Sequence, residues 1–299
     1  YLSAAAQVPD CRIAYVCTQS GHVSVDLPSY VKVVRKYQEL TKHHVIDGVI
    51  IATPPSTHFT IAKHFLTSGQ NILIEKPFTT KIVHAQTLWD LYQKKKPVVL
   101  VGHIYLFSPA FRTFLAQLPT IGKPIYGELV GCNFGQFRSD AGALWDWAPH
   151  DVSMCLSIFG RDPRSVSAQS VRSRSSGKLT DDMIYARLDF DPAAAYLTTG
   201  WLSPVKKRNV TVVGEKGMVV FDDTVDRKVT VYQGLEKTSV SYPPYKTTQP
   251  LVEELNEFVR RIHNGTAPQS DIAHGVATVR IIDAIERSIR ADGRRIRLS

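Results

Sequence analysis

The sequence of 299 residues has no apolar run that reaches the ~18 residues a membrane-spanning helix needs. Its opening stretch, YLSAAAQVPD, has neither a basic segment nor a long apolar one, so it does not predict a signal peptide. It also has no initiator methionine, and we therefore expect the chain to begin inside a longer protein. The sequence predicts no membrane partner.

Cysteine is scarce. Cys11, Cys17, Cys132 and Cys155 are dispersed and form no CxxC pair. Three of them (Cys11, Cys17 and Cys155) lie among apolar residues, so we expect buried, reduced thiols rather than disulfides. Reduced thiols favour a cytoplasmic location, and the spacing of His and Cys predicts no metal site.

Acidic residues are fewer than basic ones, 27 against 36, which gives a formal net charge of +9. The basic clusters lie at residues 94–96, 161–174 and 294–297. None is interleaved with aromatic residues and none belongs to a nucleic-acid-binding motif, so we predict no nucleic-acid partner. The clusters are interpreted as solvated surface. The alternative is that they steer an anionic ligand, such as a dinucleotide or nucleotide sugar.

The first third of the chain alternates apolar strands with amphipathic segments. Apolar strands are expected at residues 11–18, 45–53, 71–75 and 97–105. The helical spacing of apolar residues predicts helices over residues 58–69 and 80–96. Uninterrupted apolar strands joined by helices indicate a parallel sheet covered on both faces, hence an α/β Rossmann-like domain over residues 1–102.

After Gly102 the pattern changes to short alternating segments with turn glycines. This is typical of an antiparallel sheet, and VVGEKGMVVF predicts a hairpin around residues 214–217. Helices are expected over residues 251–264 and 272–291. Residues 103–299 therefore form the second predicted domain, an α+β domain with a large, mainly antiparallel sheet.

Two polar motifs follow neighbouring strands of the predicted parallel sheet. ATPPSTH begins at Ala52, and the triplet Glu75-Lys76-Pro77 ends the next strand. Ligands bind at the carboxyl ends of such strands, and an unpaired ammonium is costly there unless it meets a ligand or a carboxylate. A simple connecting turn and a surface ion pair remain the alternatives, and we favour a catalytic cleft.

A third motif lies in ALWDWAPHDVSMCLSIFG. We expect a helix that ends at Gly160 and has Pro149 in its first turn. Asp146 and His150 are four residues apart, so they share a helix face. A carboxylate beside an imidazole can fix its ring for general-base catalysis. Alternatively, Asp146 is an N-cap and His150 a satisfied interfacial histidine, while the next residue, Asp151, faces the protein interior.

In their order and spacing, GVIIATPPSTH, ILIEKPFTT and LWDWAPHD resemble the Gfo/Idh/MocA family of NAD(P)-dependent oxidoreductases. The similarity runs nearly end to end. It implies a Rossmann domain followed by an α/β domain whose open sheet forms a homo-oligomer, a dimer or tetramer. It also implies hydride transfer between NAD or NADP and a secondary alcohol or ketone of a sugar or polyol. The stretch WLSPVKKRNVTVVGEKGMVVFDD is most similar to members that act on nucleotide-linked sugars.

Residue roles are carried over from the resemblance. His150 is the general base, Lys76 stabilises the developing alkoxide, and Asp146 orients His150. The residues that the resemblance assigns to the dinucleotide are Thr53, Pro54, His58, Glu75, Lys76 and Ser20. Three further basic residues either meet acidic groups of a nucleotide sugar or face solvent: Arg112, Lys206 and Arg208.

The chain departs from the family in two ways. It contains no G-x-G triplet, so the first strand and the glycine-rich pyrophosphate turn are missing, and we expect them upstream of Tyr1. The acidic residue expected after the second strand is replaced by Gln19 and Ser20, which leaves NAD and NADP open. A non-catalytic dinucleotide- or sugar-sensing regulator with the same fold, or a structural oligomer, is the alternative. The retained Lys76, Asp146 and His150 argue against both.

Overall fold

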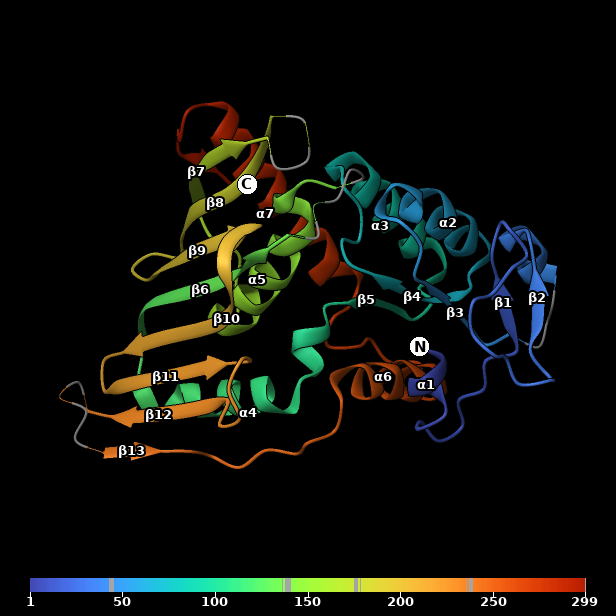
Figure 1. Ribbon diagram of the computed structural model, residues 1–299, viewed down its shortest axis with the longest axis horizontal. Helices are drawn as coiled ribbons and strands as arrows, with labels where there is room; N and C mark the ends of the chain where they lie inside the picture. The colour runs from blue at the N-terminus through green and yellow to red at the C-terminus, as the bar shows by residue number, and fades with distance from the viewer. Residues whose placement is uncertain are drawn as a thin grey trace.

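The computed structural model describes residues 1–299 except 43–45, 136, 138–140, 175–176, 178, 235, 237–238 and 299. Two regions lie side by side, a parallel α/β region and a large sheet backed by helices (Figure 1). The α/β region carries the motifs that follow neighbouring strands. The large-sheet region carries the Asp-x-x-x-His motif.

The parallel strands form two sheets instead of the single sheet that we expected. Strands β3 (Gly48–Ile51), β4 (Asn71–Glu75) and β5 (Val99–Gly102) pair in that order. Strands β1 (Tyr15–Cys17) and β2 (Lys32–Val34) form a separate parallel pair. Within the described residues no hydrogen-bond ladder joins β1 to β3, so the two parallel sheets are separate. The start of the expected strand 45–53 lies outside the described residues.

Helices cover both faces of the sheet β3-β4-β5, as a doubly wound fold requires (Figure 1). Helices α2 (Pro55–Ser68) and α3 (Ile82–Lys95) lie on one face. Helices α1 (Leu2–Ala5) and α6 (Pro250–Asn264) lie on the other. The middle of β4, residues 72–74, is fully buried, which explains its uninterrupted apolar sequence.

Helix α6, which comes from the C-terminal part of the chain, packs on the sheet β3-β4-β5. Gly48 of β3 leaves room for it, because a Cβ there would lie 2.9 Å from the ring of Phe258. The predicted domain boundary at residue 102 is a boundary in the sequence. In space, the α/β unit also contains α6, which comes from residues 103–299. No helix in the described part of the chain is long and apolar enough to cross a membrane.

The second region is built on one nine-stranded sheet of order β13-β12-β11-β10-β6-β9-β8-β7-β14. All its pairs are antiparallel except β6 with β9. Its strands are β6 (Pro124–Phe134), β7 (Ser165–Ser173), β8 (Thr180–Asp189), β9 (Ala194–Gly200), β10 (Leu202–Gly214), β11 (Gly217–Asp222), β12 (Val229–Gln233), β13 (Ser239–Ser241) and β14 (Ile296–Arg297). The hairpin predicted around residues 214–217 joins β10 to β11.

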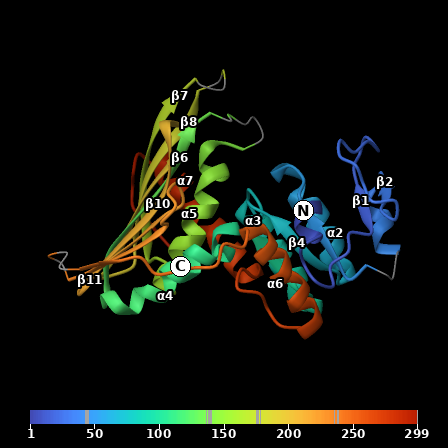
Figure 2. The ribbon, with the colours of Figure 1, turned by 60° about the horizontal axis from the view of Figure 1, so that its bottom comes forward.

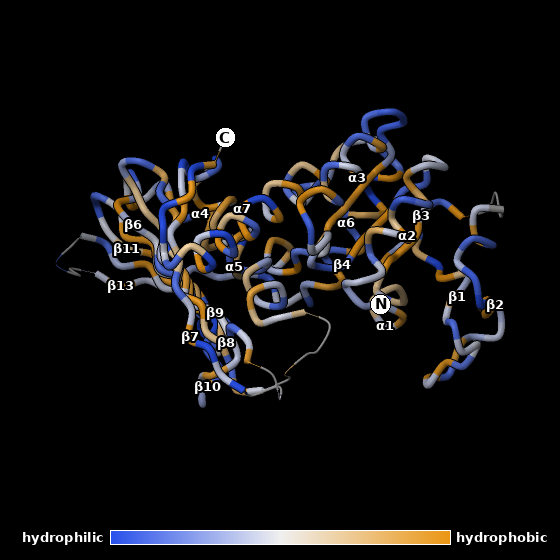
Figure 3. The backbone as a smooth tube through the Cα atoms, turned by 90° about the horizontal axis from the view of Figure 1, so that it is seen from above, coloured by the Kyte–Doolittle hydropathy of each residue, from blue (hydrophilic) through white to orange (hydrophobic). Residues whose placement is uncertain are grey.

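Helices cover one face of this sheet only (Figure 2). They are α4 (Pro109–Gln117), α5 (Ala143–Phe159) and α7 (Ile272–Arg290). Three short 3-10 helices complete the described elements: η1 (Tyr37–Lys42), which packs on α2 in the α/β region, η2 (Ile104–Phe107) and η3 (Leu118–Ile121). Along the strands hydropathy changes from residue to residue, because one side chain faces the helices and the next does not (Figure 3). On the uncovered face Tyr185 and Tyr196 are about half exposed. The predicted fold class, a Rossmann-like domain plus a mainly antiparallel sheet domain, is confirmed.

Candidate active site

Lys76 lies directly after β4 and joins the two regions of the protein. Its ammonium donates to the main-chain oxygen of Asp146 at 2.7 Å and to Oδ1 of the same residue at 3.1 Å. The two side chains are only 19% and 13% exposed. The structure therefore brings together two motifs that are 70 residues apart, and the ion pair is not a surface one.

Helix α5 supplies Asp146, and it differs from the prediction. It begins at Ala143, so Pro149 lies in its interior and not in its first turn. Proline has no N–H to offer the carbonyl four residues earlier, so one hydrogen bond of the helix is missing at this turn although the helix continues to Phe159. Lys76 binds the next carbonyl along, that of Asp146, so the ammonium bonds the helix backbone where the proline interrupts it.

The second carboxylate oxygen of Asp146, Oδ2, accepts a hydrogen bond from the indole Nε1 of Trp201 at 3.3 Å. Trp201 is 1% exposed and directly precedes β10. We expected Asp146 to orient His150, but Nδ1 of His150 is buried without a hydrogen-bond partner among the described residues. The carboxylate contacts Lys76 and Trp201, and a role for it in orienting His150 stays a prediction. GWLSP belonged to the family resemblance, but nothing in it marked Trp201 as a partner of Asp146.

His150 is partly buried on α5, and its ring stands perpendicular to that of Tyr105 with centroids 5.2 Å apart. Its pKa lies well below the ordinary histidine value, first because burial disfavours the charged form and then because of Lys76, Arg208 and His103. The imidazole is consequently uncharged at neutral pH. An uncharged imidazole can accept a proton.

His103, which follows β5, is a site residue that the sequence did not single out. It is 1% exposed, and its Nδ1 lies 2.9 Å from the hydroxyl of Ser270. Its Nε2 is buried without a partner in the described part of the chain. Burial, His274 and Lys76 lower its pKa, so this imidazole is also uncharged. The available signal was a lone histidine inside the apolar strand expected over residues 97–105.

Thr53 and Pro54 are exposed after β3, at the carboxyl end of the sheet where ligands of such folds bind. Helix α2 begins here with Pro54 as N-cap, and no side chain caps it. Pro55 has no N–H and the Thr57 N–H donates to the Pro54 carbonyl, so of the first three residues only Ser56 has an N–H with no intrahelical acceptor, and the positive end of the helix dipole lies at this edge. The hydroxyl of Thr57 donates to the Pro54 carbonyl instead of capping the helix.

His58 does not face this edge. Its side chain is fully buried, with Nδ1 2.8 Å from the Pro77 carbonyl oxygen and Nε2 2.8 Å from that of Thr53. The predicted direct contact of His58 with a dinucleotide was wrong, because both ring nitrogens face backbone inside the protein. The residue instead links the two loops that follow β3 and β4.

Glu75 faces two partners within the protein. Its Oε1 accepts a hydrogen bond from the Tyr1 hydroxyl at 2.7 Å, and its Oε2 accepts one from the Lys76 N–H. The same hydroxyl lies 3.1 Å from Glu254, whose pKa rises to about 8 because of burial and the nearby Glu75. A contact between Glu75 and a dinucleotide stays a prediction.

Ser20 is exposed in the turn after β1, and its hydroxyl accepts from the His22 N–H. The sheet β1-β2 lies at the outer end of the α/β region (Figure 1), so its role in cofactor binding also stays a prediction. Arg112 lies 3.6 Å from Glu253, and Lys206 is exposed. Arg208 is 3% exposed and paired with Asp151, which confirms the interior position expected of that aspartate.

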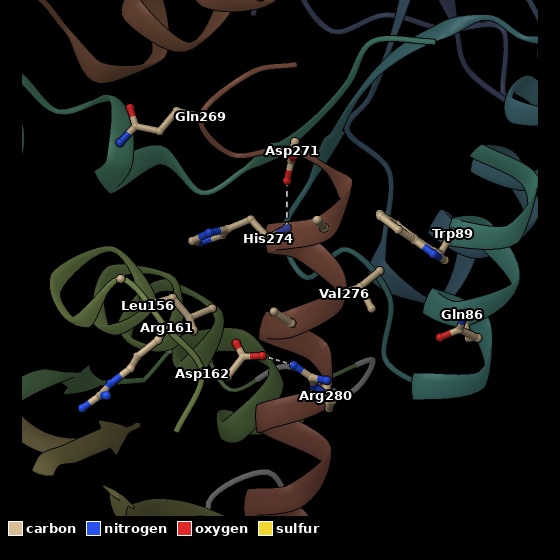
Figure 4. A pocket seen from close by; sticks show the side chains of 13 residues that line it. Gln86, Trp89, Leu156, Arg161, Asp162, Gln269, Asp271, His274, Val276 and Arg280 are labelled. Carbon is tan, nitrogen blue, oxygen red and sulfur yellow. Dashed lines mark hydrogen bonds and ion pairs between the residues drawn. The ribbon is translucent and has the colours of Figure 1, made fainter. Parts of the chain in front are cut away.

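A groove of about 570 Å³ lies apart from this cluster, between α3, α5 and α7 (Figure 4). Arg280 of α7 pairs with Asp162 across it, and Trp89 faces it from α3. Its wall includes His274, whose ring meets that of His103 at 5.3 Å between centroids. Lys76 and His150 do not line the groove. Within the described ranges no three His, Cys, Asp or Glu side chains are placed to hold a metal ion.

A Rossmann-like sheet with an ammonium, a carboxylate and an uncharged imidazole near its strand ends is typical of nicotinamide-dependent oxidoreductases. The family model for oxidoreductases with an NAD-binding Rossmann fold matches residues 23–103, and the model of the GFO/IDH/MocA C-terminal domain matches residues 131–220. Together the matches cover more than half of the chain. The chain belongs to the Gfo/Idh/MocA family.

Individual proteins agree with this assignment. The chain is 35% identical over 127 residues to UDP-N-acetylglucosamine 3-dehydrogenase of Acidithiobacillus ferrooxidans, an alignment covering 42% of the chain and 40% of that enzyme. It is 24% identical to scyllo-inositol 2-dehydrogenase (NAD(+)) of Bacillus subtilis, over 75% of the chain and 69% of that enzyme. A crystal structure of a putative oxidoreductase from Magnetospirillum magnetotacticum superposes with a TM-score of 0.85 at 27% identity, covering 95% and 94% of the two chains. The chain thus spans less than half the length of the first of these relatives.

Proposed function

We propose that this protein transfers a hydride between NAD or NADP and a secondary alcohol or ketone of a sugar or polyol. The observation that supports this most directly is the Lys76–Asp146 pair beside the uncharged His150. A cation that stabilises an alkoxide and a base that removes its proton are the two groups such an oxidation needs. The arrangement favours an enzyme over a sensing regulator, which needs neither.

The residues after β3 fit a dinucleotide, since Thr53 and Pro54 are exposed beside the uncapped start of α2. A bound nicotinamide supplies the hydride acceptor or donor. In the oxidative direction His150 removes the hydroxyl proton, and the Lys76 ammonium stabilises the alkoxide oxygen. Asp146, held by Trp201, keeps the ammonium aimed at that oxygen.

The substrate class is drawn from the relatives' names. UDP-N-acetylglucosamine and scyllo-inositol both carry secondary hydroxyls on a six-membered ring. We propose a nucleotide-linked sugar as the first candidate and an inositol as the second. Both fit the same two groups, because the proton acceptor and the alkoxide stabiliser act on a hydroxyl irrespective of the rest of the ligand.

We further propose that the uncovered face of the nine-stranded sheet forms a homo-oligomer, a dimer or tetramer. Tyr185 is 48% exposed and Tyr196 is 47% exposed there, on neighbouring strands β8 and β9. Half-exposed aromatic side chains are enriched at protein interfaces. The division into domains 1–102 and 103–299 and a cytoplasmic location, supported by four free cysteines, belong to the same proposal.

The test is the near-ultraviolet absorbance of reduced nicotinamide with each of NAD and NADP. The panel contains UDP-sugars, inositols and aldoses, and the ketone products serve for the reverse direction. We expect turnover with at least one cyclic secondary alcohol. Tight binding of dinucleotide and sugar without any turnover would contradict the enzyme and support the regulator.

A further inference from the structure

Arg208 packs against the turn of α5 that carries His150. From the sequence we expected this arginine either to contact the substrate or to face solvent. Its Nη1 donates to Oδ1 of Asp151 at 3.0 Å, and the two side chains are 3% and 1% exposed. A buried ion pair of this kind contributes little net stability, because desolvation of both charges offsets their attraction. Its presence directly beneath the site calls for another explanation.

The guanidinium is also held between two aromatic rings. Its Cζ lies 4.3 Å from the ring centroid of Trp147 and 5.0 Å from that of Tyr105. Trp147 precedes His150 by one helical turn, and the Tyr105 ring packs on the His150 ring. The cation therefore contacts Trp147, one turn before His150, and the Tyr105 ring that packs on the imidazole.

The neighbouring strand is shaped for this cation. Gly131 of β6 lies opposite Arg208 in the sheet. A Cβ on Gly131 would lie 2.4 Å from Nη1 of Arg208 and 2.7 Å from Oδ2 of Asp151. Only glycine leaves space for the pair at this position.

We propose that Arg208 is a positioning residue that holds the α5 turn carrying His150 against the sheet and places a buried cation near that imidazole. The catalytic part of this inference rests on the proposed dehydrogenase function. A buried cation near an imidazole disfavours a second positive charge. Consistent with this, the pKa of His150 is lowered by burial, by Lys76 and by Arg208, in that order.

Other charged or titratable groups also face His150, and the test must separate Arg208 from them. They are Lys76 after β4, His103 after β5 and Tyr105 in η2, while Asp146 and Asp151 lie on the same helix as His150. Substitution of Lys76 removes a group that touches the substrate, whereas Arg208 can be changed without touching the reacting atoms.

The experiment follows the His150 ring C–H signal by nuclear magnetic resonance while the pH is varied. The double variant Arg208→Gln/Asp151→Asn removes both charges and leaves no unpaired buried ion. We expect its His150 midpoint to rise by about one pH unit, the usual scale of such shifts in proteins. The single variant Asp151→Asn leaves the cation unneutralised, and its midpoint is expected to fall.

Two controls isolate the cation. Arg208→Lys keeps the positive charge, so its His150 midpoint is expected to stay close to that of the wild type. Lys207→Gln removes one charge from an exposed neighbour on the same strand and is expected to leave the midpoint unchanged, because solvent screens it. If one charge-changing variant does not fold, the other still gives a signed result.

Activity gives the second readout. The acid limb of kcat/KM is expected to follow the His150 midpoint, so that the double variant loses about tenfold more activity at acidic pH than at alkaline pH. An unchanged His150 midpoint in a folded double variant would overturn the inference. The resonance titration needs no turnover, so a protein that transfers no hydride fails the proposed function and leaves this result standing.

Discussion

Replacing Glu254 by glutamine is expected to make the stability of the protein less dependent on pH. Glu254 is 1% exposed on α6, and its Oε2 has no hydrogen-bond partner among the described residues. Its pKa rises from 4.5 to about 8, through burial first and the charge of Glu75 second. The folded state thus keeps a proton that the unfolded state loses.

The sign and size of this change in stability follow from the difference in the pKa of Glu254 between the folded and unfolded states. A raised pKa contributes stability that is fully present below pH 4.5 and is lost as the pH rises through about 8. At about 1.4 kcal/mol per unit of pKa difference, the loss is about 5 kcal/mol across that window. Glutamine cannot ionise, and its carbonyl can still accept from the Tyr1 hydroxyl. The variant is therefore expected to gain several degrees of Tm on the wild type at pH 8.5, relative to their difference at pH 5.

The assay is thermal unfolding followed by circular dichroism at pH 5, 7 and 8.5. Glu253→Gln is the matched control, since Glu253 is the adjacent residue on α6 but is 24% exposed beside Arg112. Its substitution is expected to change Tm equally at every pH. A Glu254→Gln variant with the same pH profile as the wild type would refute the reasoning.

Three further variants have separate readouts. Trp201→Phe removes the hydrogen bond to Asp146 and is expected to lower kcat about tenfold with little change in KM; full activity would contradict the role given to Trp201. His58→Ala unties the loops after β3 and β4, so dinucleotide affinity measured by fluorescence titration should fall about tenfold, and unchanged affinity would argue against that link. Tyr185→Glu/Tyr196→Glu places charge on the uncovered sheet face and should dissociate the oligomer in analytical ultracentrifugation, whereas an intact assembly would locate the interface elsewhere.

The parallel core was predictable because its strands are buried on both faces. The apolar run of β4 indicated a buried strand, and Gly69 marked the end of the preceding helix α2. The division into two sheets was not predictable from residues 11–18 and 45–53, since strand pairing depends on which neighbours are available. The helix boundary at Ala143 was missed because we expected Pro149 to confine the start of the helix, but tertiary bonds such as that from Lys76 support the interrupted turn.

The sequence pointed to candidate site residues, but it did not show which of them contact each other. Charged groups at strand ends and at helical spacing pointed to Lys76, Asp146 and His150; the structure brings Lys76 and Asp146 together, and the catalytic roles of all three stay predictions. The bond from Trp201 to Asp146 and the burial of Arg208 depend on contacts between distant elements, which spacing does not encode. His58 was misassigned because a motif on a strand end does not say which of its side chains turn inward.

The central claim is that Lys76 and His150 act on a hydroxyl while a nicotinamide exchanges hydride with the carbon. The most direct measurement is turnover of the best cyclic alcohol substrate by Lys76→Ala and His150→Ala, with Lys207→Gln as the control. We expect each of the two variants to lose about 10²-fold or more in kcat, the scale of general acid–base catalysis, while His150→Ala retains dinucleotide binding. Unchanged turnover in both variants would contradict the account.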